Sequence, residues 1–272
     1  MIGYLGPAGT FSYEAAHKYL KDKKEQLCEV SSIYALIKAA DKGEIVSAVV
    51  PIENSLEGSV NTTLDTLAFD SELYICGEYT MHIRENLMAL PGARPESIKR
   101  IISHPQPIGQ CAGMINKFFS DAVIEYTNST AAAAKQIEET KDMTTATIGP
   151  AACAGLYGLE ILMPECNDEK NNATRFVELK KQENTSADCD KSSFIFTVDN
   201  KPGALFKVIE AIAENGVNML KIESRPEKKE IGRYIFFIDT DGNIRDENLK
   251  RAWEMIKETA YKCKFLGSYR KG

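Results

Sequence analysis

Residues 3–16 read GYLGPAGTFSYEAA, a short apolar strand that passes through a glycine-rich turn into a helical pattern. The glycines do not have the G-x-G-x-x-G spacing of dinucleotide-binding turns, and no Gly-Lys-Ser/Thr follows, which excludes a P-loop. The turn lets the backbone approach a ligand, and Thr10 and Ser12 stand at a helix N-terminus, which favours anions. A plain turn with a Ser or Thr cap explains the same residues. The stretch therefore predicts a strand–turn–helix unit and leaves its function open.

This unit recurs over the first 180 residues. Apolar strands are expected at 2–5, 27–30, 46–51, 100–103, 123–126 and 145–148. Helices are expected at 12–20, 33–42, 59–69, 107–119, 130–138 and 150–156. The alternation predicts helices packed around mostly parallel sheets. Ligands of such folds bind outside the carboxyl ends of the strands.

A second pattern follows the polar stretch KKQENTSADCDKS at 180–192, which has no apolar periodicity and is typical of a linker. Strands are expected at 193–198, 217–226, 233–240 and 263–269, with helices at 203–216 and 247–260. This βαββαβ order is typical of a ferredoxin-like unit. We expect one domain at residues 1–182, a linker at 183–191 and a second domain at 192–272.

Composition excludes several classes of function. The 272 residues are 43% hydrophobic and 26% charged, as in soluble globular proteins. A net charge of −6 argues against nucleic acid as a partner. The N-terminus lacks a signal-peptide pattern and no stretch reaches transmembrane length, so we expect a cytoplasmic protein without membrane contact. Seven scattered cysteines without CxxC and three histidines without HxxxH predict reduced thiols and no metal site.

Polar side chains follow several of the predicted strands. They lie in VVPIENSLEGSV at 49–60, IISHPQPIGQCAG at 101–113 and YTNSTAAAAKQI at 126–137. The candidate side chains are Glu53, Asn54, Ser55, Ser103, His104 and Gln110. A capped loop explains each motif by itself, and a lone His beside Pro is more often structural than a general base. Several such loops at strand ends together predict a cleft rich in backbone N–H donors.

The stretch NNATRFVELK at 171–180 raises a question of charge. Strand alternation places Arg175 on one face with Val177 and Leu179, and Thr174 on the other face with Phe176. An unpaired buried cation costs several kcal/mol. Arg175 must therefore lie in water or face an anion. Thr174 and Arg175 cannot both face one ligand from a regular strand.

Taken in order, the motifs closely resemble the prephenate dehydratase family of the monofunctional bacterial kind. The resemblance covers essentially the whole chain and rests on residues 3–12, 51–55 with 58–60, 103–106 with 110–111, 129–131 and 174–176. The tail resembles an ACT regulatory domain at 203–205 and 223–226. Phe206 departs from that motif, where the family usually carries an aliphatic residue.

The resemblance implies a two-lobed α/β catalytic domain like type 2 periplasmic binding proteins. One lobe would contain residues 1 to about 75 and a segment near 160–180. The other lobe would contain residues from about 78 to 155. The implied reaction, a carbon–oxygen lyase step of phenylalanine biosynthesis, converts prephenate to phenylpyruvate with loss of carbon dioxide and water. No cofactor or metal is implied. Phenylalanine would bind as feedback effector between paired ACT domains of a homodimer or homotetramer.

The resemblance also implies roles for individual residues. Thr174 would donate a hydrogen bond to the leaving hydroxyl, backed by Glu53 or water. The implied catalytic residues are Thr174, Glu53, Asn54, Ser103 and Gln110. The implied substrate-binding residues are Arg175, Thr10, Ser12, Ser55 and Phe176. Phenylalanine would contact Gly203, Ala204, Leu205, Asn218, Met219, Leu220, Glu223, Ser224, Arg225 and Pro226. Two alternatives stay open: arogenate dehydratase, with the same chemistry on an aminated substrate, and a non-catalytic protein that binds small anions.

Overall fold

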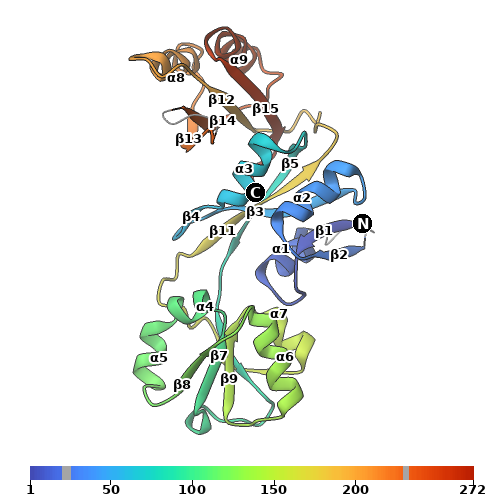
Figure 1. Cartoon of the computed structure of the whole chain (residues 1–272), viewed down its shortest axis with the longest axis vertical. Helices are drawn as coiled ribbons and strands as arrows, with labels where there is room; N and C mark the ends of the chain where they lie inside the picture. Colours follow the sequence, from blue (N-terminus) through green and yellow to red (C-terminus); the bar gives the residue numbers. More distant parts are fainter. Residues whose placement is uncertain (20–25, 229–232) are drawn as a thin grey trace. The chain divides into compact units, whose positions relative to one another are not determined.

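The computed structural model describes residues 1–19, 26–228 and 233–272. Strands and helices alternate along the chain, and the strands form three sheets (Figure 1). The chain divides into two compact units. The first contains Met1–Leu36, Val49–Thr63 and Thr80–Phe176, and the second contains Ile37–Ala48, Leu64–Tyr79 and Val177–Gly272. Within the described ranges, no helix combines the length and apolarity needed to cross a membrane.

The first sheet has the strand order β2-β1-β3-β11-β5, and the short β4 pairs with β3. Its strands are β1 (Ile2–Leu5), β2 (Leu27–Val30), β3 (Ser47–Asn54), β4 (Gly58–Ser59), β5 (Tyr74–His82) and β11 (Ala173–Lys180). The helices along this part of the chain are α1 (Phe11–Tyr19), α2 (Ile33–Lys42) and α3 (Asn61–Phe69). Strands β1 and β2 run parallel, as a strand–helix–strand unit requires. Because β4 turns back antiparallel on β3, Asn54 lies opposite Gly58 in a tight polar hairpin.

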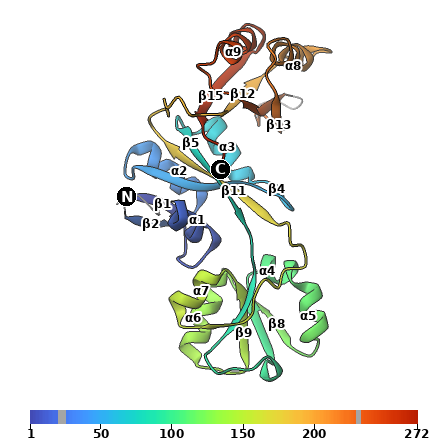
Figure 2. The same ribbon diagram turned by 180° about the vertical axis from the view of Figure 1, so that it is seen from behind.

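The second sheet has the order β10-β6-β9-β7-β8. Its strands are β6 (Asn86–Ala89), β7 (Arg100–Ser103), β8 (Val123–Tyr126), β9 (Thr145–Gly149) and β10 (Glu160–Met163). The helices are α4 (Pro105–Gln110), α5 (Ala112–Phe118), α6 (Thr130–Thr140) and α7 (Ala151–Tyr157), with a 3-10 turn at Pro95–Ser97. On β6, Leu87 and Ala89 pack with α4 and α5, whereas Met88 packs with α6 and α7. Helices therefore cover both faces of this sheet (Figures 1 and 2).

The third sheet has the order β13-β14-β12-β15, with antiparallel neighbours throughout. Its elements are β12 (Lys191–Thr197), α8 (Ala204–Glu214), β13 (Met219–Pro226), β14 (Tyr234–Asp241), α9 (Glu247–Thr259) and β15 (Lys262–Tyr269). Both helices cover one face, where Phe194 and Phe196 pack against Val208 of α8 and Ala252 of α9. This is the ferredoxin-like arrangement expected from the sequence, and the α/β fold class is confirmed.

Some predicted elements differ from those observed. The helix expected at 107–119 is two helices, because the Asp168 carboxylate accepts hydrogen bonds from the N–H groups of Gly113 (2.8 Å) and Met114 (3.2 Å) and caps α5. The helix expected from 59 begins at Asn61, since Ser59 pairs with β3. The predicted helix end at Leu20 lies outside the described residues.

The expected division into lobes was wrong at one strand. The family resemblance places a segment near 160–180, which includes residues 160–163, in the lobe of the N-terminal strands. In the structure these residues form β10, which pairs antiparallel with β6 in the second sheet. Strand β5, which was not predicted, belongs to the first sheet. The chain therefore passes between the two sheets after His82 and after Met163.

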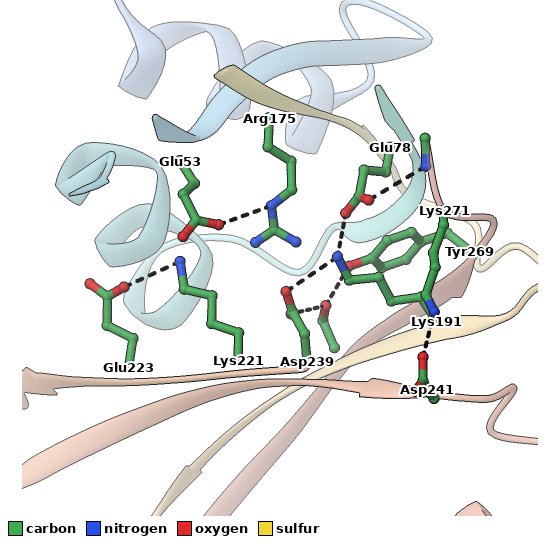
Figure 3. Close-up of polar contacts among 12 residues, drawn as sticks. Glu53, Glu78, Arg175, Lys191, Lys221, Glu223, Asp239, Asp241, Tyr269 and Lys271 are labelled. Carbon is green, nitrogen blue, oxygen red and sulfur yellow. Dashed lines mark hydrogen bonds and ion pairs between the residues drawn. The ribbon is translucent and has the colours of Figure 1, made fainter. Parts of the chain in front are cut away.

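A buried charge cluster lies in the second unit, on β5, β12 and β14. The Lys191 Nζ atom is 2.7 Å from Glu78 Oε2 and 3.6 Å from Asp239 Oδ2, and the three side chains are only 9%, 5% and 10% exposed. Figure 3 shows Lys191 between Glu78 and Asp239. Ser193 Oγ donates to Asp239 Oδ1 at 2.6 Å and lies 2.6 Å from the Tyr269 hydroxyl. One buried cation thus faces two buried carboxylates, so its removal should be costly.

Candidate active site

A cavity of about 360 Å³ lies within the first unit. Its polar lining includes Thr10, Ser12, Asn54, Gln110, Ser129 and Thr174. Its apolar lining includes Leu5, Pro51, Val60, Ile83 and Phe176. Thr10, Ser12 and Ser129 lie at the starts of helices, and Asn54 ends β3, as the loop motifs predict. Thr174 and Phe176 lie within β11. The size and mixed lining suit a small molecule with a few polar groups.

Three helices begin at this cavity, each with a capped N-terminus. Thr10 Oγ1 accepts the backbone N–H of Tyr13 (3.3 Å) at the start of α1, and Ser129 Oγ accepts that of Ala132 (3.0 Å) at the start of α6. His104 Nδ1 accepts the N–H of Gln106 (3.3 Å) ahead of α4. The positive ends of helix dipoles favour anions. No Lys or Arg stands among the lining residues of the described chain, so hydroxyls, amides and helix ends would hold an anion here.

Thr174 lies at the centre of a polar network. Its side chain is 8% exposed and lines the cavity, and its Oγ1 accepts a hydrogen bond from Asn54 Nδ2 at 2.9 Å. The Asn54 Oδ1 atom accepts the N–H groups of Leu56 (2.9 Å) and Glu57 (3.0 Å), which fixes the amide orientation. Because Thr174 Oγ1 is held as an acceptor, its own hydrogen can point into the cavity.

The network extends to Gln110 through a residue that the sequence analysis did not single out. Asn172 is 1% exposed, its Oδ1 accepts from Asn54 Nδ2 (2.8 Å), and its Nδ2 donates to Gln110 Oε1 (3.0 Å). Gln110 therefore keeps its amide Nε2 as a donor beside the cavity. The only sequence signal for Asn172 is its place in the polar turn before Thr174.

Arg175 and Glu53 form an ion pair outside the cavity lining. Their Nε and Oε2 atoms are 3.3 Å apart, and the side chains are 12% and 35% exposed (Figure 3). Thr174 and Phe176 line the cavity, so regular alternation along β11 gives Arg175 the opposite face. The anion that Arg175 faces is thus a carboxylate of the protein itself.

Ser103 and Ser55 also lie outside the cavity lining. Ser103 is fully buried and its Oγ donates to the Ile148 carbonyl at 2.6 Å, which ties β7 to β9. Ser55 Oγ donates to the Asn171 carbonyl (3.2 Å) and accepts the Ala173 N–H (2.9 Å). Both hydroxyls hold the strand ends that carry the cavity side chains.

Glu85 is a second cavity residue that sequence reasoning missed. It lies between β5 and β6, lines the cavity and is 1% exposed. Burial raises the pKa of its carboxyl from 4.5 to about 8, and the nearby Cys166 adds to the rise. Between Arg84 and Asn86 it reads as part of a solvated turn, so only tertiary structure reveals its burial.

The residues predicted to bind phenylalanine lie around the start of α8 and along β13 in the second unit. Gly203 has the left-handed φ of 83° before α8. Asn218 Nδ2 donates to Asp241 Oδ2 (2.7 Å), and Glu223 pairs with Lys221 at 3.3 Å. Arg225 makes two hydrogen bonds to Asp65 of α3, at 2.8 and 3.2 Å. The remaining predicted contacts are Ala204, Leu205, Met219, Leu220, Ser224 and Pro226.

Comparisons with known proteins agree with this geometry. The family model "Prephenate dehydratase" matches residues 2–184, and "ACT domain" matches residues 192–254. A prephenate dehydratase of Lactococcus lactis subsp. cremoris is 35% identical, over 98% of this chain and 96% of that protein. The structure of an Arthrobacter aurescens prephenate dehydratase in complex with L-Phe has a TM-score of 0.89 and 31% identity, covering 99% of this chain and 89% of that one. The quorum-quenching acylase GqqA has a TM-score of 0.88 and 27% identity, covering 100% and 98%.

The fold and the cavity define a class of protein: an α/β protein with a cavity sized for a small molecule and a ferredoxin-like unit at its C-terminus. The family model covers more than half of the chain, and a relative above 30% identity spans nearly all of it. The chain belongs to the prephenate dehydratase family.

Proposed function

We propose that the cavity binds prephenate and that this chain, as a carbon–oxygen lyase, converts it to phenylpyruvate, carbon dioxide and water. The observation that carries the proposal is the cavity-facing Thr174 hydroxyl, whose oxygen already accepts a hydrogen bond from Asn54. An acceptor bond on Oγ1 directs the Thr174 proton outward, toward the substrate. A hydroxyl leaving group placed there would receive a hydrogen bond as its charge develops.

Formation of an aromatic ring drives the reaction, and the barrier lies in expelling hydroxide as carbon dioxide departs. The substrate is a dianion, which the starts of α1 and α6, Ser12 and the Gln110 amide would hold. Rigid orientation of both carboxylates and preorganised dipoles lower such a barrier. Phe176, 2% exposed, would pack beside the ring.

Residues outside the cavity lining would hold the strands that carry the cavity side chains. The Arg175–Glu53 pair joins β11 to β3, the two strands that carry Thr174 and Asn54. Ser103 and Ser55 would likewise keep strand ends in place. In this arrangement Arg175 positions Thr174, and the carboxylates of the substrate are bound by neutral donors.

Asn54→Ala is expected to lower kcat for prephenate by at least about tenfold, the effect of losing one hydrogen bond that orients Thr174. The change also removes the acceptor for two backbone N–H groups and should destabilise the fold by about 1–3 kcal/mol. Steady-state kinetics and thermal unfolding measure the two effects. Leu56→Ala, an exposed position in the same loop, is the matched control; equal kcat values for both variants would refute the role of Asn54.

Incubation of purified protein with prephenate and, separately, with arogenate tests the substrate. We expect phenylpyruvate from prephenate, detected by chromatography, and a much slower conversion of arogenate to phenylalanine. Faster conversion of arogenate would replace the proposed substrate by its aminated counterpart. If neither is converted while prephenate still binds, the cavity is a binding site for small anions and the proposed reaction is wrong.

We also propose that the second unit binds phenylalanine at the start of α8 and along β13, as a feedback effector. The Arthrobacter aurescens relative was solved in complex with L-Phe, and the ACT model covers these residues. Strand β13 is an edge strand with Leu220 and Ile222 exposed at 42% and 40%, which suits pairing of two such units in a homodimer or homotetramer.

The initial rate of phenylpyruvate formation is expected to fall as L-phenylalanine is added, because an effector acts through unequal affinity for two states. D-phenylalanine is the control, since it has the same charge and apolar surface with the wrong handedness. A rate that stays constant across the titration, or that falls equally with both enantiomers, would contradict specific regulation.

A further inference from the structure

The Glu85 carboxyl is an unusual feature of the cavity. Glu85 is 1% exposed, and its Oε2 atom has no hydrogen-bond partner among the described residues. The backbone on either side is fixed: Glu85 N–H donates to Asn167 Oδ1 (3.2 Å), and its carbonyl accepts from the N–H (2.7 Å) and the Sγ (3.2 Å) of Cys166. Glu85 is therefore a residue of the cavity lining whose backbone is fixed on both sides of its side chain.

The surroundings of Glu85 disfavour its ionised form. The titratable groups that interact with it are the thiols of Cys111, Cys153 and Cys166. Across the cavity, the other titratable lining residues are Glu57 and His104. The neighbouring Arg84 pairs with Glu165 at the surface, where both side chains are more than half exposed. Burial, and to a smaller extent Cys166, raises the pKa of the carboxyl to about 8, so it carries a proton at neutral pH.

The proposed reaction needs such a proton, because hydroxide is a poor leaving group. The hydroxyls of the cavity are too weakly acidic to release one. His104 uses Nδ1 to accept the Gln106 N–H, a bond that imidazolium would lose. Glu57 is exposed to solvent. Glu85 is thus the one enclosed acid among the described lining residues.

We propose that Glu85 is a catalytic residue, a neutral carboxylic acid that gives its proton to the leaving hydroxyl while Thr174 hydrogen-bonds the same oxygen. The inference rests on the proposed function. The C–O bond breaks with its electron pair moving to oxygen, and the electrons of the departing carboxylate bond complete the aromatic ring. Proton transfer from Glu85 turns the hydroxide into water, and the Glu85 carboxylate regains a proton from solvent.

The proposal predicts how the activity depends on pH. Because the protonated form is active, kcat/KM should be level below and fall above about pH 8. A bound dianion disfavours a further negative charge on Glu85, so the fall in kcat should come at higher pH than the fall in kcat/KM. Glu85→Gln keeps the size and a hydrogen-bond donor but has no acidic proton. Its kcat should drop by about 10²–10⁴-fold, and the alkaline fall should disappear.

The experiment is the pH profile of phenylpyruvate formation by the wild type, Glu85→Gln and Glu165→Gln, with circular dichroism as the check on folding. Glu165, an exposed carboxylate outside the cavity lining, is the matched control and should behave as wild type. Glu85→Gln with wild-type kcat, or with the alkaline fall intact, would overturn the proposal.

Infrared spectroscopy gives a readout that does not depend on turnover. The wild type should show a protonated carboxyl band at neutral pH that disappears near pH 8 and is missing in Glu85→Gln. A carboxyl that is already ionised at neutral pH overturns the proposal even if prephenate is converted. A protein that shows the band and converts no prephenate would instead refute the proposed function.

Discussion

Replacing Thr174 with valine is expected to lower kcat for prephenate by about 10²–10⁴-fold, the usual contribution of a positioned proton or hydrogen-bond donor. Valine keeps the branched shape in the cavity wall and removes only the hydroxyl. Asn54 Nδ2 keeps its contacts to Asn172 Oδ1 (2.8 Å) and the Ala173 carbonyl (3.3 Å), so the network and the fold should survive. The loss should appear mainly in kcat, because the hydrogen bond strengthens as the leaving oxygen becomes charged.

Two variants make this result interpretable. Thr174→Ser restores the hydroxyl and should recover most of the activity. Thr140→Val is the control, since Thr140 lies at the exposed end of α6 and donates only to the Gln136 carbonyl. If Thr174→Val retained kcat within a few-fold of the wild type, Thr174 would have no part in expelling the hydroxyl.

Lys191→Met is expected to have the largest effect on stability. The change leaves Glu78 and Asp239 buried without their shared cation, a defect that typically costs about 3–5 kcal/mol. For a chain of this size we expect the thermal midpoint to fall by roughly 6–20 °C. Differential scanning calorimetry would record the shift.

The matched control is Lys201→Met, which removes an ion pair between Lys201 and Asp199 whose side chains are 74% and 57% exposed. Exposed ion pairs add little to stability, so its midpoint should barely move. Adding Glu78→Gln and Asp239→Asn to Lys191→Met should recover part of the loss, because the two buried side chains then carry no charge. Equal midpoints for Lys191→Met and Lys201→Met would show that the buried cluster contributes little.

Local patterns in the sequence correctly predicted the bounds of several helices and strands. The strands Ile2–Leu5, Arg100–Ser103 and Val123–Tyr126 and the helix Ile33–Lys42 lie at their predicted residues. Strand β5 was missed because it carries Glu78, whose burial depends on Lys191 far along the chain. The break between α4 and α5 depends on Asp168 in the same way.

For the site as well, the sequence indicates some residues, whereas their contacts appear only in the folded structure. The family resemblance groups Thr174, Asn54 and Gln110 at one site, and hydrogen bonds among these residues and Asn172 link them in the structure. Strand alternation separated Thr174 from Arg175, but no local pattern indicates that Glu53 is the partner of Arg175. Glu85 reads as a surface charge until the fold encloses it.

The central claim is that this cavity turns prephenate into phenylpyruvate with Thr174 at the leaving oxygen. The most direct measurement follows phenylpyruvate and carbon dioxide together, from prephenate, in parallel reactions with the wild type and Thr174→Val. We predict that the wild type forms the two products in equal amounts and that the variant forms neither at a comparable rate. No phenylpyruvate from the wild type, or the same rate from both proteins, would contradict the account.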